Sequence, residues 1–288
     1  MTFFAVRTRT QSRYLSWMML VLALGLHAIA LAQPTVALTF DDGFNAEGNN
    51  RVAAQYNKVI LDTLRNKNIK AMLFPLGALA DNSDTMALVK AWGNQGHAIG
   101  NHTYSHQALS STNTRRYLED IKRADLLLRQ VPGWCARLRF PYLDEGKTPE
   151  QRAEVLQWLA AEGYGVASAT ISLPDWELTK QYETLLNNVD TTGARAFLND
   201  YTKQVITQAR AQENYWQGLL KRSPAHVLLL HANPLNADAL PSIIDALRQD
   251  GWHFVTPASA FADPIYQRAL PALSANDPAV MLPSPMCN

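Results

Sequence analysis

Cysteine is scarce in this chain: Cys135 and Cys287 are the only two among 288 residues. The protein can therefore form one intramolecular disulfide at most. In an oxidising compartment such a pair often joins, and the bond would tie the C-terminal tail to the segment that precedes residue 136. The alternative, one buried thiol and one exposed thiol in the tail, stays open because spacing alone does not show whether the two Cα atoms lie close enough.

Excess charge, internal repeats and low-complexity linkers are also lacking. The formal net charge is +1, which gives no electrostatic footprint for nucleic acid or an anionic membrane. Nothing in the sequence indicates a protein partner. The remaining length predicts one catalytic domain over residues 33–265, large enough for a single core, followed by an irregular, Pro- and Ala-rich tail over residues 266–288.

The N-terminus has the features of an export signal. Arg7, Arg9 and Arg13 precede an apolar stretch at residues 15–30, and a small-x-small site ends at Ala32. This pattern predicts a signal peptide over residues 1–32 and a periplasmic or secreted protein. An uncleaved membrane anchor is the alternative, although the apolar stretch is short for a span of about 20 residues. After removal of the signal we expect no stable membrane span.

Apolar runs and helical patterns alternate along the rest of the chain. Helices are predicted over residues 52–66, 84–95, 114–130, 149–162 and 239–250, and strands over residues 69–74, 97–101, 165–169 and 252–256. Such alternation favours parallel βαβ units, and hence an α/β fold. The long segment at residues 177–222 contains helical stretches, and we expect it to pack over one rim of the fold.

Two adjacent carboxylates, Asp41 and Asp42, end the apolar run that starts at Val36 and stops at Gly43. The run is typical of a short buried strand. Neighbouring carboxylates repel each other and lose hydration when buried, so a metal ion is the usual compensation for one of them. Because successive strand side chains point in different directions, one aspartate can bind a metal while the other handles a proton. Taken alone, the pair fits an ordinary strand-to-loop turn with two solvated acids better than a metal site.

A histidine pair strengthens the metal interpretation. His102 and His106 are four residues apart, and we expect them on one face of a helical turn with Cβ atoms about 6 Å apart. Imidazole suits zinc and other late first-row metals. Together with Asp42 the pair predicts a two-histidine, one-carboxylate site with open positions for water and substrate.

Polar side chains follow two further predicted strands. The segment from Arg139 to Tyr142 follows residues 136–138, and His231 ends the apolar run at residues 227–230. Parallel α/β barrels build active sites from polar groups at the C-terminal ends of several strands. A lone strand-end histidine is more often structural, but His231 follows the same kind of run as Asp41.

Five ordered motifs resemble those of the polysaccharide deacetylases, the family 4 carbohydrate esterases with a NodB-type homology domain. They are Thr39-Phe40-Asp41-Asp42-Gly43, His102-Thr103-Tyr104-Ser105-His106, Arg139-Phe140-Pro141-Tyr142, Asp175-Trp176 and Leu229-Leu230-His231. The resemblance implies a distorted (β/α) barrel of the NodB type and the activity of a metal-dependent deacetylase.

The resemblance also implies a metal site and two proton-transfer groups. Asp42, His102 and His106 would bind a divalent metal, zinc first and Co, Ni or Mn by availability. The metal would polarise the acetyl carbonyl and acidify a bound water. Asp41 would be the general base, and His231 the general acid that protonates the leaving amine or alkoxide.

Supporting roles follow from the same resemblance. Arg139 would hold Asp41 in its ionised form, and Asp175 would orient Arg139, with His231 as the alternative partner. The backbone N–H of Tyr142 would stabilise the tetrahedral oxyanion.

Two apolar residues complete the site that the resemblance implies. Trp176 and Leu229 would line a small pocket for the acetyl methyl group. For Trp176, plain core packing is an equal alternative.

The expected substrate is an acetylated glycan such as peptidoglycan, a chitooligosaccharide or xylan, with N-acetyl or O-acetyl groups. Two alternatives stay open: a non-catalytic glycan-binding relative, and a hydrolase of a linear amide that is not a sugar. The complete set of predicted metal ligands, base and acid speaks against the first, since a degenerate relative is expected to have lost at least one of them.

Overall fold

The computed structural model describes residue 1, residues 33–44 and 50–267, and Cys287. Residues 33–288 cluster as one unit, apart from residues 1–32. The predicted signal peptide and nearly all of the predicted tail therefore lie outside the described residues. Within the described part, no helix combines the length and the apolar character that crossing a bilayer requires.

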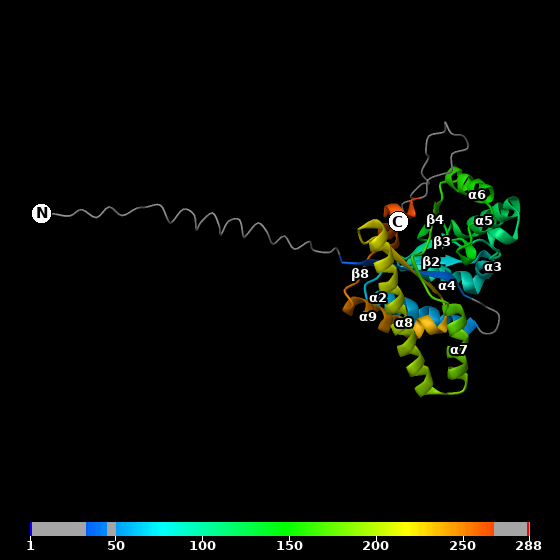
Figure 1. Cartoon of the computed structure of the whole chain (residues 1–288). Coiled ribbons are helices and arrows are strands. Elements are labelled where there is room, and N and C mark those ends of the chain that lie inside the picture. The colour runs from blue at the N-terminus through cyan, green and yellow to red at the C-terminus, as the bar shows by residue number, and fades with distance from the viewer. Residues whose placement is uncertain (2–32, 45–49, 268–286, 288) are drawn as a thin grey trace. The chain divides into compact units, whose positions relative to one another are not determined.

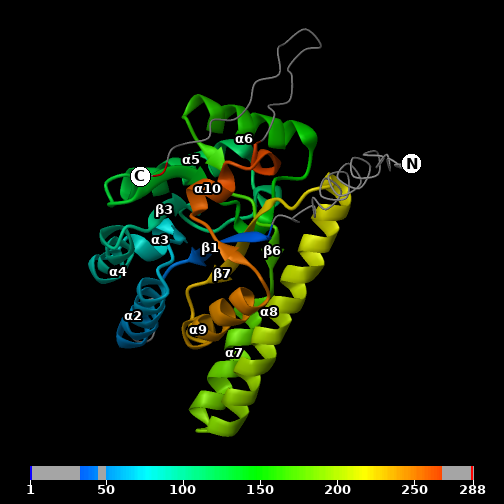
Figure 2. The same ribbon diagram turned by 90° about the vertical axis from the view of Figure 1, so that its left-hand side faces the viewer.

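A single parallel sheet forms the centre of the fold (Figures 1 and 2). Its strands follow the order β5-β4-β3-β2-β1-β7-β6, and β8 pairs with β1. The strands are β1 (Thr35–Asp42), β2 (Met72–Pro75), β3 (Ala98–Asn101), β4 (Trp134–Leu138), β5 (Gly165–Val166), β6 (Ile171–Ser172), β7 (Ala225–His231) and β8 (His253–Phe254). The sheet curls with helices packed around it, which confirms the predicted α/β barrel-like fold.

Helices connect the strands and cover the sheet. They are α2 (Asn50–Asn66), α3 (Gly77–Ala80), α4 (Ser83–Asn94), α5 (Thr114–Leu128), α6 (Pro149–Ala161), α7 (Asp175–Asn187), α8 (Thr191–Leu220), α9 (Pro234–Gln249) and α10 (Pro257–Phe261). Short 3₁₀ turns occupy Leu109–Ser111, Pro141–Leu143 and Pro264–Tyr266. Side-chain caps start many of the helices: Asn82 begins α4, for example, and Thr148 begins α6, which satisfies free N–H groups of the first turn.

Several predicted boundaries were wrong; for example, the strands expected over residues 69–74 and 252–256 are confined to Met72–Pro75 and His253–Phe254. The helix expected over residues 239–250 begins earlier, at Pro234, because Asn233 caps it and proline fits the first helical turn. The strand expected over residues 165–169 pairs only at Gly165–Val166. The helix expected to start at residue 52 begins at Asn50.

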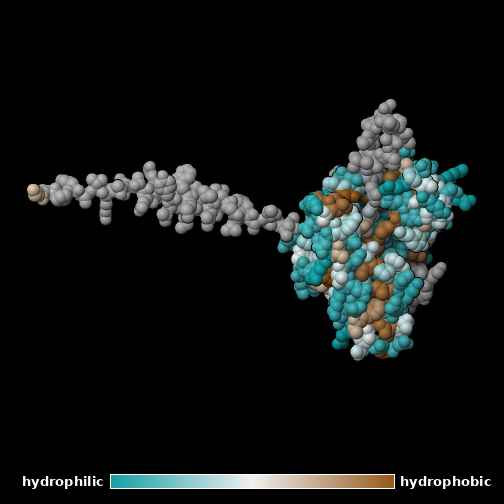
Figure 3. All heavy atoms as spheres, in the orientation of Figure 1, coloured by the Kyte–Doolittle hydropathy of each residue, from teal (hydrophilic) through white to brown (hydrophobic). Residues whose placement is uncertain are grey.

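The segment between β6 and β7 forms an antiparallel pair of helices, α7 and α8, and α8 runs beside β6 and α9 (Figure 2). Its inward face is apolar, with Val205 and Ala209 fully buried. Figure 3 shows a band of apolar side chains along the seam of the two helices. The segment is thus a substantial part of the fold, packed at one side of the sheet.

Cys135 of β4 and Cys287 form a disulfide, with Cα atoms 4.9 Å apart. The bond closes a separation of 152 residues. It joins the end of the chain to β4, as the pairing alternative in the sequence had predicted.

Candidate active site

Polar side chains gather around one cavity at the carboxyl ends of the strands. The register of β1 and β7 pairs Asp41 with His231 directly, so the last residues of these two strands enter the same space. The cavity measures about 460 Å³. Its walls contain eight of the ten predicted site residues together with three others: Asp41, Asp42, His102, His106, Phe140, Tyr142, Leu143, Ser172, Trp176, Leu229 and His231.

Asp42, His102 and His106 place one possible metal-ligand atom each within 4.8 Å of the others. Asp42 Oδ1 lies 3.5 Å from His102 Nε2 and 3.4 Å from His106 Nε2. Two imidazole nitrogens and a carboxylate oxygen match the donor set that zinc and similar ions prefer.

Hydrogen bonding around these atoms fits a cation at their centre. The carbonyl oxygen of Arg139 lies 2.8 Å from His102 Nδ1 and accepts a hydrogen bond from the Nδ1–H group. In the neutral ring, the Nε2 lone pair then faces Asp42. Asp42 Oδ1 is buried and no hydrogen bond from the described residues satisfies it. A divalent ion would relieve both of these unfavourable lone-pair contacts.

The pKa shifts of Asp42 and His106 favour the forms in which these two groups bind a metal. Burial alone would raise the pKa of Asp42, but its interaction with His102 and the charges of His231 and His106 outweigh burial and lower that pKa to about 2. Burial, followed by the charge of His102, lowers the pKa of His106. The site therefore favours an ionised carboxylate beside a neutral imidazole.

The two histidines lie on a loop after β3, so the predicted helical turn was wrong. Thr103 and His106 both have left-handed backbones, with φ of 65° and 60°. Asp120 Oδ2 accepts the N–H groups of Tyr104 at 3.0 Å and Ser105 at 2.9 Å. These bonds hold the loop in a shape that brings both rings to one ion site without helical geometry.

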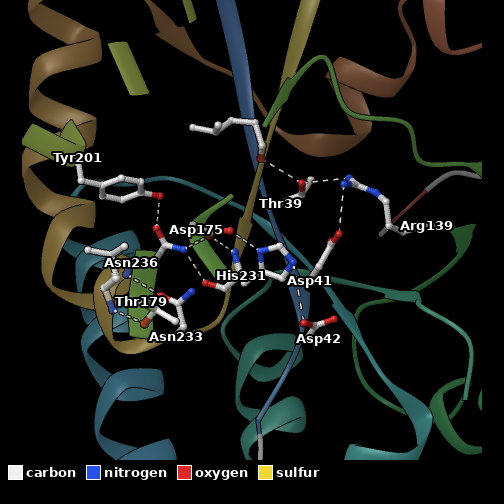
Figure 4. A network of polar contacts seen from close by, with 12 residues as sticks. Thr39, Asp41, Asp42, Arg139, Asp175, Thr179, Tyr201, His231, Asn233 and Asn236 are labelled. Atoms are coloured by element: carbon white, nitrogen blue, oxygen red, sulfur yellow. Dashed lines mark hydrogen bonds and ion pairs between the residues drawn. The ribbon is translucent and has the colours of Figure 1, made fainter. Parts of the chain in front are cut away.

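Asp41 is buried, and its carboxylate contacts the guanidinium of Arg139. Arg139 Nη1 lies 3.5 Å from Asp41 Oδ2, and Arg139 Nη2 donates to Thr39 Oγ1 at 3.1 Å (Figure 4). Thr39 in turn donates to the carbonyl oxygen of Leu228. A fully buried guanidinium therefore lies beside the Asp41 carboxylate.

Asp175 binds His231, which decides between the two partners that the sequence left open. Asp175 Oδ1 lies 2.6 Å from His231 Nδ1, and Asp175 Oδ2 accepts the His231 backbone N–H at 2.8 Å (Figure 4). Burial lowers the pKa of His231, but Asp175, followed by Asp41 and Asp42, outweighs burial and raises that pKa to about 9. The imidazole is thus oriented and kept protonated at neutral pH.

Comparison with known proteins places this geometry in a family. Residues 29–160 match the family model described as polysaccharide deacetylase. A peptidoglycan-N-acetylglucosamine deacetylase of Bacillus cereus is 31% identical over 227 residues, which cover 78% of this chain and 68% of the relative. The chain belongs to the polysaccharide deacetylase family. It is therefore an enzyme of the hydrolase class.

Two further similarities come from a solved structure and a larger enzyme. A crystal structure of a peptidoglycan N-acetylglucosamine deacetylase, bound to an N-hydroxybenzamide, is 26% identical with a TM-score of 0.57, covering 80% of this chain and 88% of that one. A bifunctional xylanase/deacetylase of Pseudobutyrivibrio xylanivorans is 23% identical over 80% of this chain and 31% of its own length. The fold of this deacetylase-family chain thus agrees with that of a solved member.

Aromatic and apolar side chains form the outer wall of the cavity in this family member. Tyr142 is 70% exposed and its ring lies 4.6 Å from that of His106. Trp176 is 48% exposed and contacts the ring of His231 at 5.5 Å, which rules out the core-packing alternative for Trp176. Leu229 is buried at the floor.

Sequence reasoning missed several residues at the site. Phe140, Leu143 and Ser172 line the cavity, and only Phe140 stood within a recognised motif. Asn236 donates to Asp175 and has no motif signal at all. Its contact spans 61 residues of sequence, so no local pattern could have predicted it.

Proposed function

We propose that this protein is an exported, divalent-metal-dependent deacetylase that removes N-acetyl groups from a glycan. The observation that carries the proposal is the convergence of Asp42, His102 and His106 within 4.8 Å in a cavity that also contains Asp41 and His231. Three ligands, a base and an acid in one cavity are the groups that amide hydrolysis needs.

The metal would be held by Asp42 Oδ1 and by the Nε2 atoms of His102 and His106. When bound there, a divalent ion, most readily zinc, would supply Lewis acidity that polarises the acetyl carbonyl and acidifies a water molecule. The donor set also accepts Co, Ni or Mn.

Asp41 and His231 would move the protons. Asp41 Oδ1 is buried and receives no hydrogen bond from the described residues, so it is available to take a proton from the attacking water. Arg139 would hold the Asp41 carboxylate in place for that step, through Nη1 at 3.5 Å from Asp41 Oδ2. His231, whose pKa is raised to about 9, would give the proton on Nε2 to the leaving nitrogen. Addition of water and cleavage of the C–N bond then give acetic acid and a free amine, and the proton taken up by Asp41 replaces, through solvent, the proton that His231 has given up.

Three cavity residues would bind the acetyl group. The left-handed backbone of Tyr142, with φ of 58°, accompanies a sharp turn at the cavity, and its N–H would donate to the oxyanion. Leu229 and Trp176 would enclose the methyl group. A buried leucine floor and a half-exposed indole wall suit a small apolar substituent on a polymer that stays outside.

Peptidoglycan is the substrate that we favour. The relatives named peptidoglycan-N-acetylglucosamine deacetylase support N-acetylglucosamine as the sugar, and a signal peptide at residues 1–32 would bring the enzyme to that polymer in the periplasm or outside the cell. The similarity to a xylanase/deacetylase keeps O-acetyl xylan as the second candidate.

Metal content and acetate release, measured together, test the proposal. Asp41→Asn and His231→Ala are expected to keep one metal per chain and to lose acetate release from N-acetylated glycan by at least about a hundredfold each. If both variants bind metal and retain full turnover, the assigned chemistry is wrong. Mass spectrometry of the exported protein tests the signal peptide, since intact residues 1–32 would contradict it.

A further inference from the structure

A continuous chain of hydrogen bonds links helix α8 to His231 (Figure 4). The Tyr201 hydroxyl of α8 donates to Asn236 Oδ1 at 2.8 Å. Asn236, in the first turn of α9, donates through Nδ2 to Asp175 Oδ2 and, at 2.9 Å, to the carbonyl oxygen of His231. The two carboxylate oxygens of Asp175 then accept hydrogen bonds from the backbone N–H and the Nδ1–H of His231. The chain thus runs from α8 through α9 and the start of α7 to the end of β7.

The three side chains that connect α8 to the His231 imidazole are all buried from solvent. Tyr201 is 1% exposed, and Asn236 and Asp175 are 0% exposed. A buried polar atom that loses its partner cannot replace it with solvent. Each of these side chains therefore depends on its neighbour in the chain for its orientation.

The Tyr201 hydroxyl fixes which way the Asn236 amide faces. Because this donor occupies Asn236 Oδ1, the amide nitrogen is directed at Asp175 and at the His231 carbonyl, so both kinds of atom in the amide are satisfied. A reversed amide would place its oxygen against the carboxylate. We propose that Tyr201 and Asn236 are positioning residues that hold the Asp175 carboxylate, and through it the His231 imidazole, in the geometry for proton transfer.

This inference rests on the proposed function, because it takes His231 as the general acid. It also gives the α7–α8 segment a role beyond packing. Residue 201 lies in the long segment between the fourth and fifth motifs, where the sequence offers no catalytic pattern. Through Tyr201, this segment is connected by hydrogen bonds to the Nδ1 side of the His231 ring. The substrate cavity is lined by His231 but not by Asp175, Asn236 or Tyr201.

A matched pair of tyrosine variants tests the inference. Tyr201→Phe removes only the hydroxyl that binds Asn236. Tyr182→Phe makes the same change at another buried tyrosine, whose hydroxyl donates at 2.6 Å to Oδ2 of the exposed Asp238 and also links α7 to α9. We expect Tyr201→Phe to lower kcat for acetate release about tenfold with KM unchanged, and Tyr182→Phe to change neither. Both variants should keep wild-type metal content.

An isosteric change and a spectroscopic readout complete the test. Asn236→Asp replaces the donor with a second carboxylate oxygen beside Asp175 and is expected to lower kcat at least about a hundredfold. Proton NMR of the wild type should show a downfield signal for the short His231 Nδ1–H bond, which Tyr201→Phe shifts upfield or broadens and Tyr182→Phe leaves in place.

Three outcomes would overturn the inference: wild-type kcat in Tyr201→Phe, equal losses in both tyrosine variants, or an unchanged His231 signal in Tyr201→Phe. Failure of the proposed function looks different. In that case the wild type itself releases no acetate from any glycan while metal is bound.

Discussion

Replacing Asp175 with asparagine is the sharpest single perturbation of the proposed acid. The side chain keeps its size but loses its charge, and one of its two oxygens becomes an NH₂ group. Asp175 now accepts from His231 Nδ1, from the His231 backbone N–H and from Asn236 Nδ2. An amide oxygen can replace only part of this set, so its NH₂ group must face a donor.

The raised pKa of His231 sets the scale of the effect. A pKa of about 9, compared with the ordinary 6.5, corresponds to a net preference of about 3 kcal/mol for the imidazolium. Asp175 is the first contributor that raises this pKa, and burial opposes it. Without the carboxylate we expect the pKa to fall to 6.5 or below. At pH 7.5 the protonated fraction then drops from nearly all to about a tenth.

Loss of orientation adds to the loss of charge. The combined effect is expected to be about a hundred- to a thousandfold in kcat, with KM within about threefold, because the substrate contacts stay in place. Since the acid form exists below the pKa, wild-type activity should fall as pH rises towards 9, and the variant should lose activity at lower pH. Asp245→Asn, at a half-exposed aspartate of α9 paired with Lys67, is the matched control and should leave the profile unchanged.

Steady-state kinetics across pH 5 to 10 measure both effects. The reasoning would be refuted if Asp175→Asn kept kcat within threefold of the wild type while His231→Ala lost activity more than a hundredfold. An unshifted alkaline limb would also contradict it, because the charge of Asp175 would then not govern His231.

Other perturbations have equally definite outcomes. His102→Ala removes a metal ligand and should weaken metal binding, measured by calorimetry, by more than about a hundredfold, because loss of an outer-shell partner alone costs about ten- to a hundredfold. If the variant still bound one metal per chain at micromolar concentration, the metal site would have to lie elsewhere. Cys287→Ser should lower the free energy of unfolding by about 2–5 kcal/mol, seen as a lower Tm that a reductant reproduces in the wild type. We expect kcat to stay unchanged because Cys135 lies near the amino end of β4, whereas the site lies at the carboxyl ends of the strands. His97, whose pKa burial and then Lys70 lower to about 4, gives stability that is complete above pH 6.5 and is lost as pH falls through 4. Denaturant titrations should therefore show wild type losing about 3 kcal/mol more than His97→Gln between pH 7 and pH 4, whereas parallel losses would disprove the effect.

The parts of the site that lie at strand ends could be predicted from the sequence. Apolar runs that end in Asp41 and His231 indicate parallel strands whose carboxyl ends meet at one edge, and the register of β1 and β7 pairs these two residues. This step needs only the rule that parallel strands present their ends on one side.

Contacts that depend on loops and on distant segments could not be predicted. The spacing of His102 and His106 suits a helix and equally suits a loop, and only the left-handed backbones of Thr103 and His106 distinguish the two. The partner of Asp175 stayed open because its contact with His231 spans 56 residues. Neither pattern nor propensity encodes such pairings, which arise when α7 packs against β7.

Acetate release in the presence and absence of a chelator tests the central claim most directly. The purified, zinc-loaded protein would be assayed on peptidoglycan, chitooligosaccharides and acetylated xylan. The account predicts release from an N-acetylated glycan, peptidoglycan first, which the chelator abolishes and added zinc restores. Release that survives full removal of the metal, or no release from any of the three with one metal bound per chain, would contradict it.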